Sequence, residues 1–148
     1  MHDRLTHPRT GRGFTLVEML TVLMILAIIL GLGVGISRYL MEEAARKQTE
    51  VTQAVLMDAI LRYKTITGSP PASLNALVNT SDPKLDEVKA IALKVQKDKF
   101  DGTTAWDGWG SIMDYQAAGG RGGTPVIISG GSDRNMTTTD NNVRSDSN

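Results

Sequence analysis

The strongest constraint in the sequence is an apolar run over residues 14–36 that contains a single charged residue, Glu18. As an α-helix this run would rise about 34 Å, long enough to cross the hydrocarbon core of a bilayer. A chain with such a segment has to bury it in lipid or in the core of an assembly. A carboxylate near the start of a membrane-spanning helix is energetically costly, so Glu18 is predicted to have a partner of opposite charge.

A short polar segment, residues 1–13, precedes the apolar run and carries three arginines against one aspartate. A basic flank of this kind keeps the N-terminus in the cytoplasm. A secretory signal peptide is an alternative, since it also joins a basic start to an apolar stretch. The run is too long for a typical signal peptide, however, and no small-residue cleavage site ends it. The small residue, Gly13, lies before the run instead.

The composition excludes several classes of function. The chain has no cysteine, which rules out disulfides and thiolate metal sites. Both histidines lie in residues 1–13, and the rest of the chain has no nucleophile elbow or convergent pair of carboxylates. The formal net charge is zero and no basic stripe is present, so nucleic acid is not an expected partner. We therefore expect a structural protein and not an enzyme.

Residues 37–67 are predicted to continue the apolar run as an amphipathic helix. Apolar residues recur there at intervals of three or four, with a second row beside them. The first row is Val51, Val55, Ala59, Tyr63 and Ile66, and the second is Leu56 and Ile60. Gly68 and the prolines after it are predicted to end the helix. Glycines at 31, 33 and 35 weaken one turn, which fits either close helix packing or a segment that melts during assembly.

Residues 68–148 predict a small domain. We expect a helical turn within 72–78 that turns Leu74, Leu77 and Val78 toward the long helix. A second helix should follow, with Asp82 as N-cap and Pro83 at its first position. Its apolar face would hold Leu85, Val88, Ile91, Ala92 and Val95.

Strands over residues 111–116 and 124–129 are predicted to pair antiparallel through the glycine-rich turn at 119–123. The expected fold class is α+β. A long N-terminal α-helix, membrane-spanning in its first half and amphipathic in its second, would pack against a small C-terminal domain. That domain would contain a short helix and an antiparallel sheet of two or three strands.

The segment Gly13-Phe-Thr-Leu-Val-Glu18 resembles the cleavage and methylation motif of type IV pilins and type II secretion pseudopilins. The resemblance implies a pilin-like fold and a leader, residues 1–13, that prepilin peptidase removes on the cytoplasmic side. Cleavage between Gly13 and Phe14, followed by N-methylation, would leave N-methylphenylalanine at position 14. The resemblance also implies that Glu18 pairs with the N-terminal amine of a neighbouring subunit during filament growth.

Three further segments are similar to the major pseudopilin of the type II secretion system. They are the loop over 68–77, the pattern of Asp107, Trp109, Gly110 and Tyr115, and the turn over 128–133. The resemblance implies a structural subunit that polymerises into a periplasmic filament and drives protein export across the outer membrane. A type IV or competence pilin is the alternative, although the chain lacks cysteines for the usual C-terminal disulfide loop. A membrane-anchored enzyme or binding module is a third class, which no motif supports.

In the major pseudopilins the C-terminal loop binds calcium, so the resemblance implies a possible Ca²⁺ site here. Calcium takes six to eight oxygen ligands. Candidate ligands are Asp133, Asp140, Asn141 and Asp146, with Asn142 beside them. Arg134 stands where the family usually has glycine, and Arg144 adds a positive charge. A floppy polar tail is the alternative.

The resemblance also implies the partners and the location. The partners would be further copies of the chain, minor pseudopilins, the prepilin peptidase and the inner-membrane assembly platform. The chain would cross the bacterial inner membrane once, with its N-terminus cytoplasmic and residues 68–148 periplasmic, and would then join a periplasmic filament.

Overall fold

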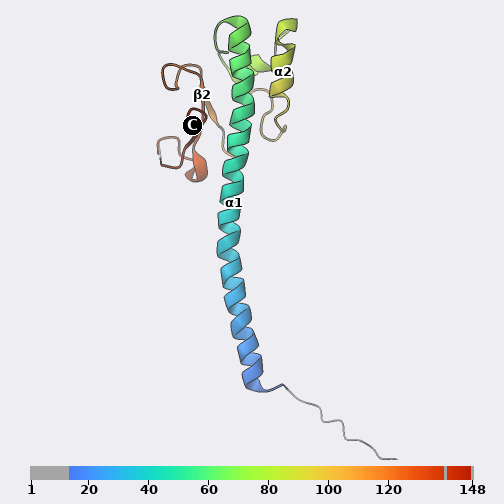
Figure 1. Cartoon of the computed structure of the whole chain (residues 1–148), viewed down its shortest axis with the longest axis vertical. Helices are drawn as coiled ribbons and strands as arrows, with labels where there is room; N and C mark the ends of the chain where they lie inside the picture. The colour runs from blue at the N-terminus through green and yellow to red at the C-terminus, as the bar shows by residue number, and fades with distance from the viewer. Residues whose placement is uncertain (1–13, 139, 148) are drawn as a thin grey trace, which may run out of the picture. The chain divides into compact units, whose positions relative to one another are not determined.

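The computed structural model describes residues 14–138 and 140–147 (Figure 1). The chain divides into two units, Met1–Tyr39 (unit 1) and Leu40–Asn148 (unit 2). The long helix α1, Leu16–Thr67, contributes residues to both. The predicted leader, residues 1–13, lies outside the described part of the chain.

Thr15 and Glu18 form the N-terminal cap of α1. The backbone N–H of Thr15 donates to Glu18 Oε2 at 3.2 Å, and the backbone N–H of Glu18 donates to Thr15 Oγ1 at 3.2 Å. This reciprocal pair is a capping box, which satisfies two backbone donors that a helix start leaves free. The helix therefore begins at Leu16, slightly later than the predicted start at residue 14.

Unit 1 consists of the apolar part of α1. Its large apolar side chains are exposed in the described residues, from Leu16 at 84% to Ile36 at 60%. By length and composition, α1 is long and apolar enough to cross a membrane. The backbone is helical through residues 31–35, so the glycines do not interrupt α1.

In unit 2, α1 ends as the sequence predicts. Gly68 adopts a left-handed φ of 85°, and its N–H donates to the carbonyl oxygen of Lys64 at 2.8 Å. This geometry is a glycine C-cap. The chain then turns through Pro71, which is buried, into a 3₁₀ turn, η1, at Leu74–Leu77. Both leucines are buried, which confirms the predicted turn and its apolar contacts.

The second helix is shorter than predicted. It starts as a 3₁₀ turn, η2, at Pro83–Leu85 and becomes α2 over Asp86–Ala92. Asp82 caps it as predicted, because its carboxylate accepts the N–H of Lys84 at 3.0 Å. Val95 lies beyond the end of α2 and still packs against the core.

One apolar core joins α1 to the rest of unit 2. Its members are Leu56, Ala59, Ile60, Leu74, Leu77, Leu85, Val88, Ala92, Phe100, Ala105, Met113 and Ile127. The prediction for α1 was partly wrong: Val51 is 63% exposed and Ile66 is exposed, although Ala59 is buried. The buried face follows the second row, Leu56 and Ile60, and continues toward the N-terminus through the polar residues Thr49, Thr52 and Gln53.

The sheet has three antiparallel strands, in agreement with the prediction of an α+β fold. They are β1 at Asp114–Gln116, β2 at Val126–Ser129 and β3 at Val143–Arg144, in the order β1-β2-β3. Asp114 pairs with Ile128, and Ser129 pairs with Val143. β1 is shorter than the predicted 111–116 because Ile112 instead forms an isolated bridge with Trp106. β3 lies within the segment that was considered as a polar tail.

Candidate assembly site

Glu18 lies in the first turn of α1, on a segment whose large apolar side chains are exposed. Its carboxylate accepts hydrogen bonds from the N–H of Thr15 at 3.2 Å and from the Thr15 hydroxyl at 3.4 Å, both at Oε2. A carboxylate in this position also interacts favourably with the helix dipole. The side chain is therefore held in place before any partner binds, and it presents a negative charge at the start of the apolar segment.

Of the two residues that flank the predicted cleavage site, the structure describes Phe14 only. Phe14 precedes the cap and is 78% exposed, whereas Gly13 lies outside the described residues. Phe14, Thr15 and Glu18 thus lie within one turn of chain at the start of α1. If cleavage occurs before Phe14, the new N-terminal amine would lie four residues before Glu18 in the same chain.

The Asp107–Ser111 loop in unit 2 packs directly on α1. The N–H of Gly108 donates to the hydroxyl of Thr49 at 2.8 Å, and that hydroxyl donates to Ala45 O at 2.8 Å. A Cβ atom added to Gly108 would overlap the carbonyl group of Ala45. Glycine at position 108 therefore permits a close approach of two backbones, which the residues around it in the sequence do not predict.

Asp107 is the centre of this loop and is fully buried. Its Oδ1 accepts the N–H groups of Trp109 at 3.0 Å and Ser111 at 2.7 Å. Its Oδ2 accepts the hydroxyl of Ser129 at 2.7 Å, which ties the loop to the end of β2. A buried carboxylate with three donors is well satisfied, so Asp107 serves to fix the loop.

Tyr115 and Gln53 join the sheet to other parts of unit 2. The Tyr115 hydroxyl donates to Pro71 O at 2.8 Å, and burial raises the pKa of Tyr115 to about 12, so the hydroxyl keeps its proton. Gln53 Nε2 on α1 donates to Ile127 O at 3.2 Å and to Val143 O at 2.9 Å. Sequence periodicity missed Gln53 because a polar side chain on a helix is usually assigned to solvent.

Asp146, one of the predicted calcium ligands, has a cationic partner in the chain. Its Oδ1 lies 2.9 Å from Arg144 Nε, and its Oδ2 accepts the N–H of Arg121 at 3.1 Å. Hydrogen bonds from Arg144, supported by the Arg121 N–H, lower the pKa of Asp146 to about 2. A carboxylate paired with a guanidinium is a poor ligand for a second cation.

The other predicted ligands have separate roles. Asp133 accepts the hydroxyl of Thr138 at 2.7 Å and the N–H of Asn135 at 2.9 Å, and these bonds lower its pKa. Asp140 is exposed, and Asn141 Nδ2 donates to Ser132 at 3.4 Å.

Within residues 14–138 and 140–147, no three His, Cys, Asp or Glu side chains gather around a potential metal position. The predicted set does not fit a single calcium site, and we propose no calcium-dependent step. Asn142 Oδ1 is buried and accepts no hydrogen bond from the described residues, although buried acceptors of this kind are commonly satisfied by ordered water.

The comparisons with known proteins concern the N-terminal segment. Residues 9–34 match the family described as the prokaryotic N-terminal methylation motif. The matched stretch contains Gly13, Phe14 and Glu18. Neither a curated protein nor a solved structure matches the chain. The matched motif, a prepilin-type signal at the start of an apolar helix, indicates a type IV pilin-like protein of the pilin and pseudopilin superfamily.

Proposed function

We propose that this chain is a structural subunit of a type II secretion pseudopilus and that it polymerises through the apolar part of α1 into a periplasmic filament. The observation that carries the proposal is Glu18 within a methylation motif, in the first turn of a helix whose apolar side chains are exposed. Burying those side chains against other copies removes them from water or lipid, and the paired charge fixes their register. The subunit itself catalyses no reaction.

Two features of unit 2 favour a pseudopilin over a type IV or competence pilin. The chain has no cysteine, so a disulfide cannot close its C-terminal loop. That loop is held instead by β3, the Arg144–Asp146 pair and the bonds from Gln53. The Asp107 loop and Tyr115, which carry the resemblance to the major pseudopilin, form buried links within unit 2.

The experiment compares the full chain with Glu18→Ala and Glu18→Gln in a bacterium that supplies the peptidase and assembly machinery. Mass spectrometry should find N-methylated Phe14 at the start of the wild-type chain. Membrane insertion should survive both substitutions, because they remove a charge from an apolar segment. Filaments released from the periplasm by opening the outer membrane should be lost in both variants, since each lacks the anion that pairs with a neighbouring amine.

Two results would contradict the proposal. A wild-type chain that keeps Met1 would show that residues 1–13 are no prepilin leader. Normal filaments from Glu18→Gln would show that the charge plays no part in assembly.

A further inference from the structure

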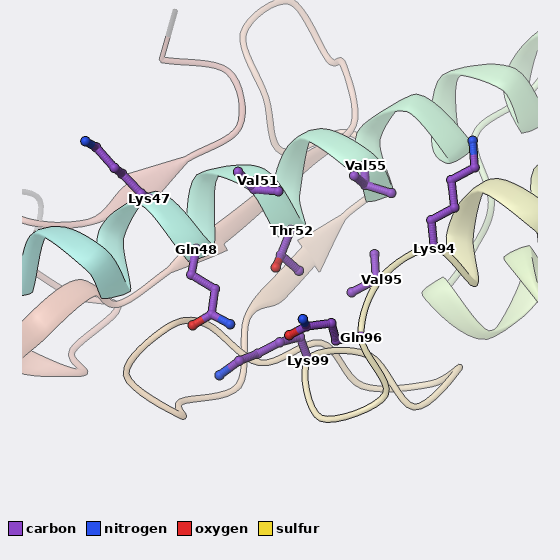
Figure 2. Close-up of a pocket in the computed structure, with 9 residues that line it drawn as sticks. All are labelled: Lys47, Gln48, Val51, Thr52, Val55, Lys94, Val95, Gln96 and Lys99. Carbon is purple, nitrogen blue, oxygen red and sulfur yellow. The ribbon is translucent and has the colours of Figure 1, made fainter. Parts of the chain in front are cut away.

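A pocket on unit 2 combines three lysines with an apolar floor and has no acidic residue in its lining. Lys47 on α1 and Lys94 and Lys99 after α2 provide the charge, and Val51, Val55 and Val95 provide the floor (Figure 2). The cavity measures about 390 Å³, which is large enough for several side chains. We call this site the lysine pocket.

The structure leaves much of this positive charge free to meet a ligand. Lys47 Nζ lies 3.7 Å from Glu43 Oε1, with the Lys47 side chain 70% exposed and the Glu43 side chain 44% exposed, so that ion pair contributes little. Lys99 donates to the backbone carbonyl of Asp107 at 3.2 Å and keeps its net charge. In the part of the chain that the structure describes, Lys94 forms no ion pair. Figure 2 shows Lys47 and Lys94 at opposite ends of the group.

The apolar floor indicates that the lysine pocket binds a ligand, because lysines that only face solvent need no exposed valine between them. Val51 is 63% exposed on a helix whose neighbouring face is packed into the core. An exposed valine between lysines suits a segment that brings one apolar side chain and flanking carboxylates. The ligand chemistry is therefore an acidic protein segment with an apolar residue in its middle.

Outside the lysine pocket, unit 2 carries more acidic than basic residues. Residues 40–148 contain 12 Lys and Arg against 14 Asp and Glu. Three of the basic residues line the lysine pocket, which leaves nine against 14 on the remainder. The C-terminal loop places exposed Asp133 and Asp140 on either side of Met136, which is 40% exposed. Arg134, beside Asp133, is also exposed and donates to the backbone carbonyl of Trp109 at 3.1 Å. Figure 1 shows β2 and α2 on opposite sides of α1 in unit 2.

We propose that the lysine pocket binds the acidic C-terminal loop of a second copy of this chain, with Met136 against the valines and Asp133 and Asp140 near the lysines. The contact joins two different surfaces, so each copy keeps one free pocket and one free loop. Such heterologous contacts propagate into open helical assemblies when they do not close into a ring. The inference deepens the proposed filament function and rests on it.

The first test reverses charge in the full chain and measures the filament released from the periplasm when the outer membrane is opened. Lys47→Glu with Lys94→Glu should lower the filament yield at least roughly tenfold, because like charges then face each other. The matched control, Lys84→Glu with Lys97→Glu, makes the same change in net charge at exposed lysines outside the pocket. Its yield should equal that of the wild type.

The rescue adds Asp133→Lys and Asp140→Lys to the pocket variant. If the two surfaces meet, this chain with both signs exchanged should again form filaments, whereas the loop variant alone should not. An unchanged yield in the pocket variant, or no rescue, would overturn the inference.

The second test uses the absence of native cysteines. A full chain with Lys94→Cys and Asp140→Cys should form a ladder of disulfide-linked dimers, trimers and longer species on mild oxidation. The control pair, Lys97→Cys with Asp140→Cys, should give a much weaker ladder. Equal ladders, or cross-links from the thiol introduced at position 94 to a different protein, would overturn the second copy as occupant.

The two proposals fail separately. If filament formation requires Glu18 but is unchanged in the pocket variants, the proposed function is supported and the role of the lysine pocket is wrong. If the wild-type chain forms no filament, the proposed filament function is wrong. A ladder of cross-linked chains from Lys94→Cys with Asp140→Cys would then still show that the loop of one copy contacts the pocket of another.

Discussion

Two buried polar residues of unit 2, Asp107 and Thr49, hold segments of the chain together through hydrogen bonds. Asp107 holds three donors from inside the protein, and Thr49 passes a hydrogen bond from one backbone to another. The bonds from Trp109 and Ser111 to Asp107 are local. The bond from Ser129 to Asp107 and the bond from Gly108 to Thr49 join segments far apart in the chain, so neighbouring residues in the sequence do not predict them. The Asp107-x-Trp-Gly pattern was recognised from sequence, but its physical role was not.

Gly108→Ala tests the close approach of the Asp107–Ser111 loop to α1. The added methyl would overlap the backbone of Ala45, which cannot move like a flexible side chain, so unit 2 should lose about 1–3 kcal/mol of stability. Both tryptophans of the chain, Trp106 and Trp109, lie at this loop, so their fluorescence reports the urea midpoint.

Gly31→Ala is the matched control for Gly108→Ala. No atom lies within 4 Å of a Cβ at position 31, so the fluorescence midpoint should stay at the wild-type value. If Gly108→Ala also unfolds at the wild-type midpoint, the loop does not approach α1 as described.

At the scale of elements, local signals were reliable and non-local ones were not. The C-cap at Gly68, the N-cap at Asp82 and the pairing of β1 with β2 follow from residues adjacent in sequence, and all three are confirmed. β3 escaped prediction because its two residues carry little strand pattern. It forms where Ile128 and Ser129 of β2 pair with its two residues and Gln53 on α1 donates to Val143 O. The buried polar residues of α1, Thr49, Thr52 and Gln53, were also not predicted. Gln53 and Thr49 bond to segments far away in the chain, which helical periodicity does not reveal.

The attachment of β3 should depend on pH. The pKa of Asp146 falls to about 2 in the folded state, whereas an unperturbed aspartate titrates near about 3.9. A depressed folded pKa stabilises the fold above the unfolded pKa, and this contribution is lost as pH falls from about 4 to about 2. Arg144→Gln should therefore lower the urea midpoint at pH 6 and have little effect at pH 2. An equal difference at both pH values would assign the effect of Arg144 to packing.

The whole molecule combines two kinds of surface with different needs. Unit 1 exposes apolar side chains on the stretch of α1 up to Tyr39, which carries one acidic residue, Glu18. Unit 2 has its own core and nearly balanced charge. The N-terminal match and the pattern of apolar residues indicate the superfamily. They do not distinguish secretion from pilus assembly, because both uses place the same demands on the apolar helix.

Deleting the gene in its own bacterium separates the two uses. For a pseudopilus subunit, secreted proteins should accumulate in the periplasm, while surface pili and DNA uptake remain normal. The wild-type gene should restore export, and the Glu18→Ala gene should not. Normal export with lost pili or lost DNA uptake would favour the pilin alternative.

The capping box at Thr15 and Glu18 has a consequence for how a subunit waits before assembly. Because Thr15 already donates to the Glu18 carboxylate, a lone subunit does not hold a bare anion beside lipid. Pairing with a neighbour's amine would then be an exchange of one set of donors for another, with a smaller driving force than the meeting of two unsolvated ions. Under the proposed function, the smaller driving force would make the contact between two subunits easier to reverse.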